Sequence, residues 1–131
     1  MKKTLLIILP LLLIVGCSKE PINYKTSLVK RDGVFYTNDT NKSYSGKVFS
    51  LYSDGKKKDE GSIKDGKRNG LWTEWYTDGH KKSEGTYKDG KRNGLWTTEF
   101  YTDGQKMGEE TFKAGELIDL KYWDEDGNLI E

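Results

Sequence analysis

The decapeptide Lys-Asp-Gly-Lys-Arg-Asn-Gly-Leu-Trp-Thr occupies residues 64–73 and recurs without a change at residues 88–97. Each copy leads into a Tyr-Thr-Asp-Gly tetrapeptide, and landmarks before and after the two copies return every 23 to 25 residues. Self-similarity at such a period marks one supersecondary unit stacked on copies of itself. The chain is therefore predicted to be a repeat protein, with full units at residues 61–84 and 85–109 and partial copies on both sides.

The residues between the landmarks favour strands. No stretch of the repeats places apolar residues at i, i+3, i+4 and i+7 over the length of a helix, whereas short runs of Trp, Tyr, Thr and Val lie between Asp-Gly and Asn-Gly pairs. Short runs of this kind, bounded by turn-forming pairs, are typical of strands joined by hairpin turns. Aromatic residues make up 12% of the chain, so they must supply much of the buried area. The predicted fold is all-β, an elongated antiparallel β-meander built from repeated hairpins of about 24 residues.

The turns predict a strand register. Asp78-Gly79 suits a two-residue type I′ turn, which would place Trp72 opposite Gly85 and Trp75 opposite Lys82. Residues 65–70 would form a six-residue connection that sets Ile63 opposite Trp72, and its copy would set Tyr87 opposite Trp96. Alternation along the strands then gathers one set of residues on a single face: Ile63, Trp72, Tyr76, Gly85, Tyr87 and Trp96. The opposite face, which includes Leu71, Thr73 and Trp75, is mixed and predicted to be more solvated.

The second full unit contains one residue more than the first. Trp-Thr-Thr-Glu-Phe-Tyr at residues 96–101 replaces Trp-Thr-Glu-Trp-Tyr at residues 72–76. A single insertion in a strand moves every later side chain to the wrong face. We therefore predict a β-bulge at Thr97-Thr98 that absorbs the extra residue.

The start of the chain has the features of a secretory signal. Two lysines follow Met1, an apolar run covers residues 5–15, and Gly16-Cys17 ends it. The run is too short for a membrane span, which needs about 20 apolar residues. Residues 14–17, Ile-Val-Gly-Cys, resemble the lipobox of bacterial lipoproteins, which implies cleavage before Cys17 and a diacylglyceryl group on its thiol. An ordinary cleaved signal is the alternative.

These features divide the chain into three parts: a lipoprotein signal peptide at residues 1–16, the lipidated Cys17 and a polar tether at residues 17–26, and a repeat domain at residues 27–131. Acyl chains on Cys17 would hold the protein at a membrane. Ser18 stands where bacterial lipoproteins retained in the inner membrane carry Asp, so the resemblance implies the outer membrane, facing the periplasm.

The charge pattern argues against nucleic acid as a partner. The whole chain has 22 Lys+Arg against 21 Asp+Glu, and loss of the two lysines of the signal leaves 20 against 21. Basic and acidic residues alternate along the chain and form no basic stripe. The corners Lys67-Arg68 and Lys91-Arg92 are predicted to be solvated turns.

Residues 85–97, Gly-Thr-Tyr-Lys-Asp-Gly-Lys-Arg-Asn-Gly-Leu-Trp-Thr, are followed by Phe-Tyr-Thr-Asp-Gly-Gln-Lys at residues 100–106. This pattern resembles the bacterial variant of the MORN repeat, and in particular the proteins grouped as YwqK-type antitoxins. The resemblance covers about residues 34–131. It implies an elongated antiparallel β-meander, and it suggests either membrane association or the neutralising of a partner toxin. The lipoprotein-like signal predicts that this chain acts in the cell envelope rather than in the cytoplasm.

Catalysis, a cofactor and a metal are not expected. His80 is the single histidine, and its place in neighbouring copies is taken by Lys56 and Gln105, as at a solvated turn position. No second histidine and no other cysteine than Cys17 exist to complete a nucleophilic or metal site. Residues 124–128, Asp-Glu-Asp-Gly-Asn, resemble part of a calcium loop but lack its later glutamate.

The aromatic residues leave two hypotheses open. They could form the core of the repeat, stacked from copy to copy, which we favour. They could instead form an interaction surface for a protein or for sugar rings, with these candidates: Trp72, Trp75, Tyr76, Tyr87, Trp96 and Tyr101. The preferred function is a non-catalytic, lipid-anchored envelope protein that binds an unidentified protein, such as a toxin that it neutralises. The alternative is a cell-wall or glycan-binding module that uses the aromatic face.

Overall fold

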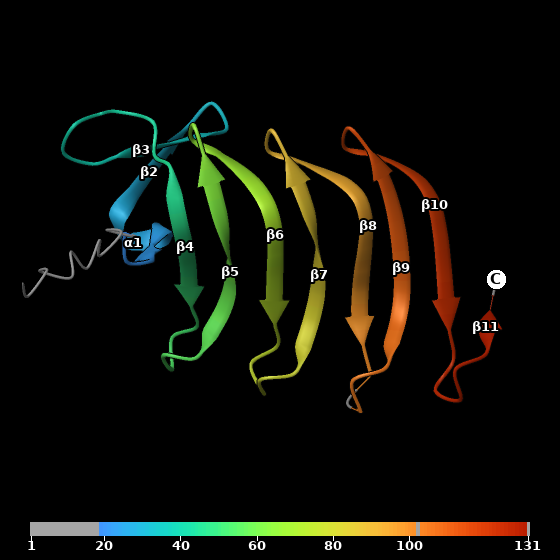
Figure 1. The fold of residues 1–131 in the computed structure, drawn as a ribbon. Helices are drawn as coiled ribbons and strands as arrows, with labels where there is room; N and C mark the ends of the chain where they lie inside the picture. Colours follow the sequence, from blue (N-terminus) through green and yellow to red (C-terminus); the bar gives the residue numbers. More distant parts are fainter. Residues whose placement is uncertain (1–18, 102, 131) are drawn as a thin grey trace, which may run out of the picture.

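The computed structural model describes residues 19–101 and 103–130, and the predicted signal peptide and Cys17 lie outside this part of the chain. The described residues form a nine-stranded sheet in the order β1-β4-β5-β6-β7-β8-β9-β10-β11 and a separate two-stranded sheet, β2-β3 (Figure 1). The main sheet consists of β1 (Ile22–Asn23), β4 (Gly46–Leu51), β5 (Lys57–Lys64), β6 (Lys67–Trp75), β7 (Lys81–Lys88), β8 (Lys91–Phe100), β9 (Lys106–Lys113), β10 (Glu116–Trp123) and β11 (Leu129–Ile130). The remaining elements are α1 (Tyr24–Ser27), β2 (Leu28–Arg31) and β3 (Val34–Thr37).

The predicted antiparallel meander of successive hairpins is confirmed from β4 to β11, and β1 adds to β4 in parallel. The hairpins alternate between two kinds of turn. At Asp65-Gly66 both residues have positive φ, 49° and 79°, as a two-residue type I′ turn requires. At the other ends of the strands the loops have three residues: Tyr76 N donates to His80 O at 2.8 Å, and Gly79 N donates to Tyr76 O at 3.0 Å. The type I′ turn predicted at Asp78-Gly79 is therefore wrong, because only Gly79 has positive φ there.

The register beyond this loop nevertheless agrees with the prediction in part. Trp72 lies opposite Gly85, as expected. Trp75 lies opposite Lys81 instead of Lys82, because the loop is one residue longer than a type I′ turn. Lys82 then bulges out of β7 and cancels the offset, so the pairing returns to the predicted register.

The register at the type I′ ends is different from the prediction. Ile63 lies opposite Arg68 and Tyr87 opposite Arg92, not opposite the two tryptophans. The pairing then shifts. Ser62 pairs with Asn69 and Glu60 pairs with Thr73, so three residues of β6 lie opposite the single residue Gly61, two more than in regular pairing. Gly70 has a φ of 77°, which glycine adopts without strain. The shift brings the Trp72 indole over Gly61, where a side chain would collide with the ring.

The predicted bulge at Thr97-Thr98 is also wrong. Both residues pair continuously with β7 and with β9. In the β8-β9 hairpin, Thr98 pairs with Gly108 and Phe100 pairs with Lys106. One residue on each strand lies between these two pairs, so neither strand bulges there. The extra residue of β8 therefore fills the place where Lys82 bulges in the preceding hairpin. The insertion removes a bulge instead of creating one.

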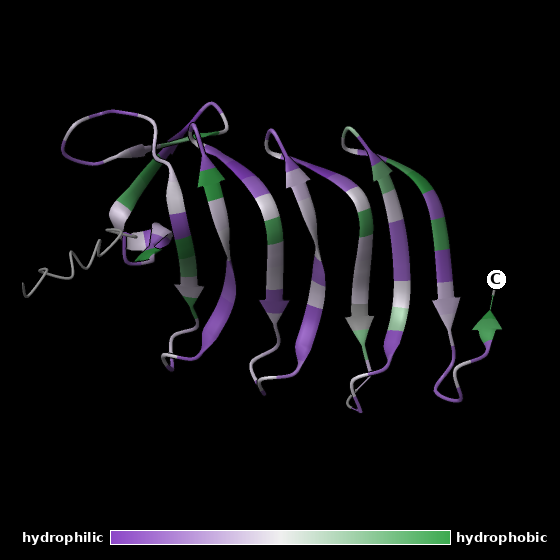
Figure 2. Ribbon diagram, in the orientation of Figure 1, coloured by the Kyte–Doolittle hydropathy of each residue, from purple (hydrophilic) through white to green (hydrophobic). Residues whose placement is uncertain are grey.

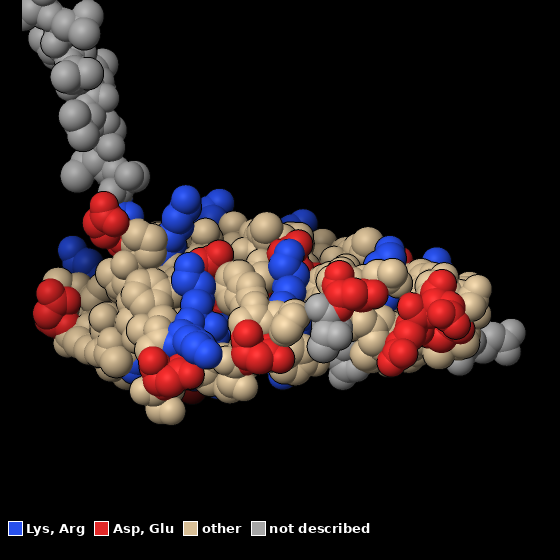
Figure 3. Space-filling model, turned by 90° about the horizontal axis from the view of Figure 1, so that it is seen from below, with Lys and Arg blue, Asp and Glu red and all other residues tan. Residues whose placement is uncertain are grey.

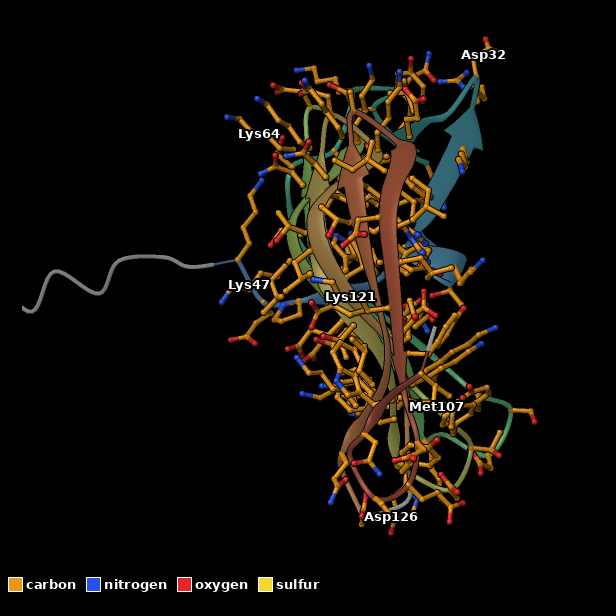
Figure 4. All side chains as sticks on the ribbon, turned by 90° about the vertical axis from the view of Figure 1, so that its right-hand side faces the viewer. Asp32, Lys47, Lys64, Met107, Lys121 and Asp126 are labelled. Carbon is orange, nitrogen blue, oxygen red and sulfur yellow. The ribbon has the colours of Figure 1, made fainter. Side chains whose placement is uncertain are left out.

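The core lies on one face of the sheet, called the inner face here, and it contains Val48, Ile63, Trp72 and Trp96. Viewed along the sheet, α1 and the β2-β3 pair lie on one side, and Lys47 extends from the other (Figure 4). The short N-terminal elements bury Tyr24 and Leu28 against the inner face. The folded part therefore begins earlier than residue 27, since residues 22–26 of the predicted tether belong to β1 and α1.

Candidate interaction surface

The structure places the predicted interaction residues in different environments. Trp72 and Trp96 are 1% and 0% exposed, so their rings cannot stack on a ligand. Each indole covers a glycine of the preceding strand: a Cβ at Gly61 would lie 2.3 Å from the Trp72 ring, and one at Gly85 would lie 2.2 Å from the Trp96 ring. The surface prediction is wrong for these two residues, because the glycines let the indoles lie flat on the backbone.

Other residues of the repeat hold the indoles in place. Trp96 Nε1 donates to Thr86 O at 3.0 Å, and the Arg92 guanidinium lies 4.2 Å from the indole centroid. Arg68 covers Trp72 in the same way, at 4.4 Å. A guanidinium over an indole gains about 0.5–2 kcal/mol. The two arginines are therefore packing residues, and the prediction that they are solvated is wrong.

The four remaining candidates are half-buried and do not form one surface. Tyr87 lies between the two indoles, 6.0 Å from the Trp72 centroid and 5.0 Å from that of Trp96, in edge-to-face contacts. Tyr101 donates its hydroxyl to Trp123 O at 3.0 Å, so it ties two hairpins together near the loops. Trp75 and Tyr76 lie at the same loop end of β6. A continuous aromatic platform for sugar rings is therefore not formed by the six residues.

The opposite face, called the outer face here, carries exposed leucines instead. Leu71 is 60% exposed and Leu95 53% exposed, and they occupy the same position in the two identical decapeptides. Both leucines stand next to a buried tryptophan, so strand alternation directs them away from the core. The sequence placed Leu71 on the mixed face but did not single out these leucines. The feature of the sequence that could have identified them is the exact repetition of Leu beside Trp in the two decapeptides.

Ion pairs border the leucines in each repeat. Lys57 contacts Glu60 at 2.6 Å, and Lys106 contacts Glu109 at the same distance. Lys81 contacts Glu84 at 3.1 Å, and Glu84 also accepts a 2.9 Å hydrogen bond from the buried Thr73 hydroxyl. Exposed pairs of this kind contribute about 0–1 kcal/mol each. Their main effect is to leave the outer face close to neutral around its apolar side chains.

A groove of about 770 Å³ crosses β4, β5 and β6 on the outer face. Its apolar lining includes Phe49, Leu51 and Leu71, and Glu20 and Pro21 form part of its border. The groove is partly open to solvent, so a side chain or segment of a macromolecule could enter it from outside.

A buried polar cluster joins the N-terminal segment to the inner face. The Asp59 carboxylate accepts hydrogen bonds from the Tyr24 hydroxyl at 2.8 Å and from the Ser50 hydroxyl at 2.7 Å. Burial raises the pKa of Tyr24 above 10.0, and the hydrogen bond to Asp59 raises it further. Because all three side chains are buried, the cluster stabilises the fold and does not reach a ligand.

The three-residue loops form a charged edge of the sheet. Viewed from below, basic and acidic side chains are interspersed along it, and acidic side chains gather toward its C-terminal end (Figure 3). The Asp78 carboxylate accepts a hydrogen bond from the backbone N–H of His80, which lowers the pKa of Asp78. Desolvation raises the pKa of Tyr101, and the charges of Glu125, Asp124 and Asp103 add to this effect.

His80 lies in one of these loops with its Nδ1 3.1 Å from an Asp78 carboxylate oxygen. Among residues 19–101 and 103–130, no three His, Cys, Asp or Glu side chains are placed to share a metal ion. The same part of the chain contains no helix long and apolar enough to cross a bilayer.

The comparisons with known proteins agree with the hairpin geometry. Neither a curated protein nor a solved structure significantly matches the chain. One family model, described as the MORN repeat variant, matches residues 68–89. This segment runs from the second strand of one hairpin through the three-residue loop and into the next turn, so it contains Trp72 and the Gly85 that lies opposite it. Residues 68–89 are therefore a MORN repeat variant, with Leu71 on its exposed side and Trp72 on its buried side.

Proposed function

We propose that this protein is a non-catalytic binding module, held in the cell envelope by acyl chains on Cys17, that presents the outer face of its sheet to a protein partner. The observation that carries this proposal is the exposure of Leu71 and Leu95 at identical positions of consecutive repeats. The MORN repeat variant at residues 68–89 is consistent with a repeat-based binding module. Exposed apolar side chains that recur in a pattern favour a recognition surface over scattered chance exposure.

The spacing of the leucines suggests the shape of the partner. Leu71 and Leu95 lie two strands apart, on β6 and β8, and neighbouring strands are about 4.8 Å apart. The leucines are therefore separated by about 10 Å across the sheet. A helix that crosses the strands presents residues i and i+7 about 10.5 Å apart, because each residue adds 1.5 Å. We therefore expect a partner helix with apolar side chains at this spacing.

The resemblance of residues 14–17 to a lipobox supports a setting in the cell envelope. Cys17 precedes Pro21 by four residues, a span of at most about 14 Å in an extended chain. An acylated Cys17 would thus hold the domain close to the membrane, in the outer membrane facing the periplasm. In this position the protein would act as an immunity-like partner, binding a toxin that acts in the envelope.

The test uses the full chain with Leu71→Lys and Leu95→Lys together. The proposal predicts that wild-type protein retains its partner during purification from envelope extracts and protects cells against the toxin, and that the double variant loses both properties. Val29→Lys is the matched control, because Val29 is exposed but belongs to β2. Equal retention and protection by the double variant would refute the role of the outer face.

Anchoring has a separate test. Cys17→Ala should move the protein from the membrane fraction to the soluble periplasmic fraction, because it removes the acylation site. A variant that stays in the membrane fraction would contradict lipid anchoring without affecting the argument for the outer face.

A further inference from the structure

The loop between β3 and β4 carries the two N-glycosylation acceptor sequences of the chain. Residues 38–43 are Asn-Asp-Thr-Asn-Lys-Ser, so the tripeptide Asn-X-Ser/Thr begins at Asn38 and again at Asn41. This tripeptide, with any residue but proline in the middle, is the sequence at which a glycan is attached to asparagine in exported proteins. No other asparagine of the sequence is followed two places later by Ser or Thr. The loop therefore offers a chemistry that the repeats lack.

This loop is accessible to a modifying enzyme. Every residue from 38 to 43 is exposed. Figure 1 shows the loop extending beyond β4, on the side away from the later hairpins, and Figure 2 shows its hydrophilic colour. Backbone hydrogen bonds close it: Thr37 N donates to Lys42 O at 2.9 Å, and Asn41 N donates to Thr37 O at 3.2 Å. An enzyme can therefore open residues 38–43 by breaking a few exposed hydrogen bonds, without moving a buried side chain.

The second of the two acceptor sequences has its reacting groups free. Asn41 Oδ1 accepts a hydrogen bond from Arg31, and within the described residues its Nδ2 has no acceptor. The hydroxyl of Ser43, which completes this acceptor sequence, also has no side-chain partner in that part of the chain. The hydroxyl of Thr40, which completes the first acceptor sequence, contacts the hydroxyl of Thr37 instead.

A carboxylate further distinguishes the two asparagines. Asp39 stands two residues before Asn41, whereas Tyr36 stands two residues before Asn38. Bacterial oligosaccharyltransferases require an acidic residue at that place, because a cationic side chain of the enzyme pairs with its carboxylate. Asp39 is exposed, and its Oδ1 accepts a hydrogen bond from the N–H of Thr40 at 2.8 Å, which leaves Oδ2 for such a contact. The acid therefore selects Asn41.

We propose that Asn41 is the acceptor of an N-linked glycan, which an oligosaccharyltransferase of the cell envelope transfers from a polyprenyl pyrophosphate-linked oligosaccharide. This inference rests on the export that the proposed function requires. Asn41 Nδ2 attacks C1 of the first sugar, so that the N–C1 bond forms and the bond from C1 to the pyrophosphate oxygen breaks. The lipid pyrophosphate leaves with the electron pair, and a base of the enzyme takes one Nδ2 proton. The attachment point lies beyond β4, apart from Leu71 and Leu95 on β6 and β8.

The test produces the full chain in bacteria that contain an oligosaccharyltransferase and its polyprenyl-linked oligosaccharide, and it measures the mass of the protein from the envelope fraction. Wild-type protein should gain the mass of one glycan, and fragmentation of the peptide that contains both asparagines should place the glycan on Asn41. Asn41→Gln should remove it. Asp39→Asn should lower the rate of glycosylation by about tenfold or more, the loss expected when one charge-assisted contact is removed.

Asn38→Gln is the matched control, because it removes the other acceptor sequence from the same loop and should leave the glycan in place. A glycan on Asn38, or envelope protein of unmodified mass, would overturn the inference while anchoring by Cys17 stands. A chain that stays in the cytoplasm would instead contradict the envelope setting of the proposed function. The purified enzyme, supplied with the full chain and the lipid-linked oligosaccharide, then decides separately: glycosylation of Asn41 supports the inference, and an unmodified chain overturns it.

Discussion

The glycine under each indole gives the sharpest test of this packing. In Gly85→Ala, the new Cβ would lie 2.2 Å, 2.4 Å and 2.5 Å from Cδ2, Cγ and Cε2 of Trp96, whereas ordinary contacts are 3.4–4 Å. The indole would have to move by more than 1 Å. It is fully buried, donates a hydrogen bond to Thr86 O and is covered by Arg92, so little room exists for the movement.

Whether Gly85→Ala raises or lowers the free energy of unfolding shows which of two effects dominates. Replacing glycine by alanine without a steric conflict stabilises a protein by about 0.4–1 kcal/mol, because the unfolded chain loses freedom. Overpacking a dense core costs about 1–3 kcal/mol. For a ring held this firmly we expect the upper part of the range, a net loss of about 2 kcal/mol. In a domain of about 100 residues this lowers the Tm by about 8–16 °C.

The assay is equilibrium urea unfolding followed by far-ultraviolet circular dichroism, with the m value compared between variants. Gly61→Ala should behave in the same way, because a Cβ there meets Trp72 at 2.3 Å. The control is Gly85→Ala in a Trp96→Leu background, where no ring covers residue 85 and the change should become neutral or stabilising. Wild-type protein that is stabilised by Gly85→Ala, or an equal loss in both backgrounds, would refute the reasoning.

Three further predictions concern neighbouring residues. Trp96→Ala should cost about 3–5 kcal/mol, whereas Leu95→Ala should change the unfolding free energy by less than about 0.5 kcal/mol; similar values in urea unfolding would contradict the face assignment. Folding favours the neutral Tyr24 phenol, so its contribution is complete below pH 10.0 and is lost as pH rises through the higher pKa of the folded state. Tyr24→Phe should flatten the alkaline fall in Tm, and an unchanged slope would exclude Tyr24 as its source. Arg92→Lys should lower stability by about 1 kcal/mol, since a lysine retains the charge but loses planar stacking on Trp96; thermal melts that match wild type would show that the charge alone suffices.

The repeat and its strands were predictable because their signals are local. An exact decapeptide fixes the period, and alternation beside a buried tryptophan separates Leu71 from Trp72. The turn types were not predictable in the same way, because the Asp-Gly dipeptide occurs at both ends of the strands. At Asp65 both residues adopt positive φ. At Asp78 the carboxylate accepts a hydrogen bond from the N–H two residues later, which stabilises a different turn with the same dipeptide.

The register errors follow from this ambiguity. Pairing Ile63 with Trp72 assumed that the long connection at residues 65–70 contained no strand residues. In the structure the strand resumes at Lys67, and the extra residues around Gly70 become a bulge. Tertiary packing selects that arrangement, because the indole must lie over a strand position that has no Cβ. The effect of the insertion in β8 was mispredicted for a similar reason. It depends on the bulge at Lys82 in the preceding hairpin, and the sequence does not reveal that bulge.

The identity of the repeats also limits how a partner can recognise the protein. Residues 64–73 and 88–97 present the same side chains, so a partner that contacts one copy cannot distinguish it from the other by chemistry alone. Position along the array must come from the places where the copies differ. At one end, Glu20 and Pro21 border the groove beside Leu71. At the other end, β10 carries Leu117 where the repeats carry arginines that cover the indoles. Leu117 cannot supply that guanidinium, so this end differs from the repeats in chemistry. The departures from the repeat at its two ends are therefore what would let a partner tell one end of the array from the other.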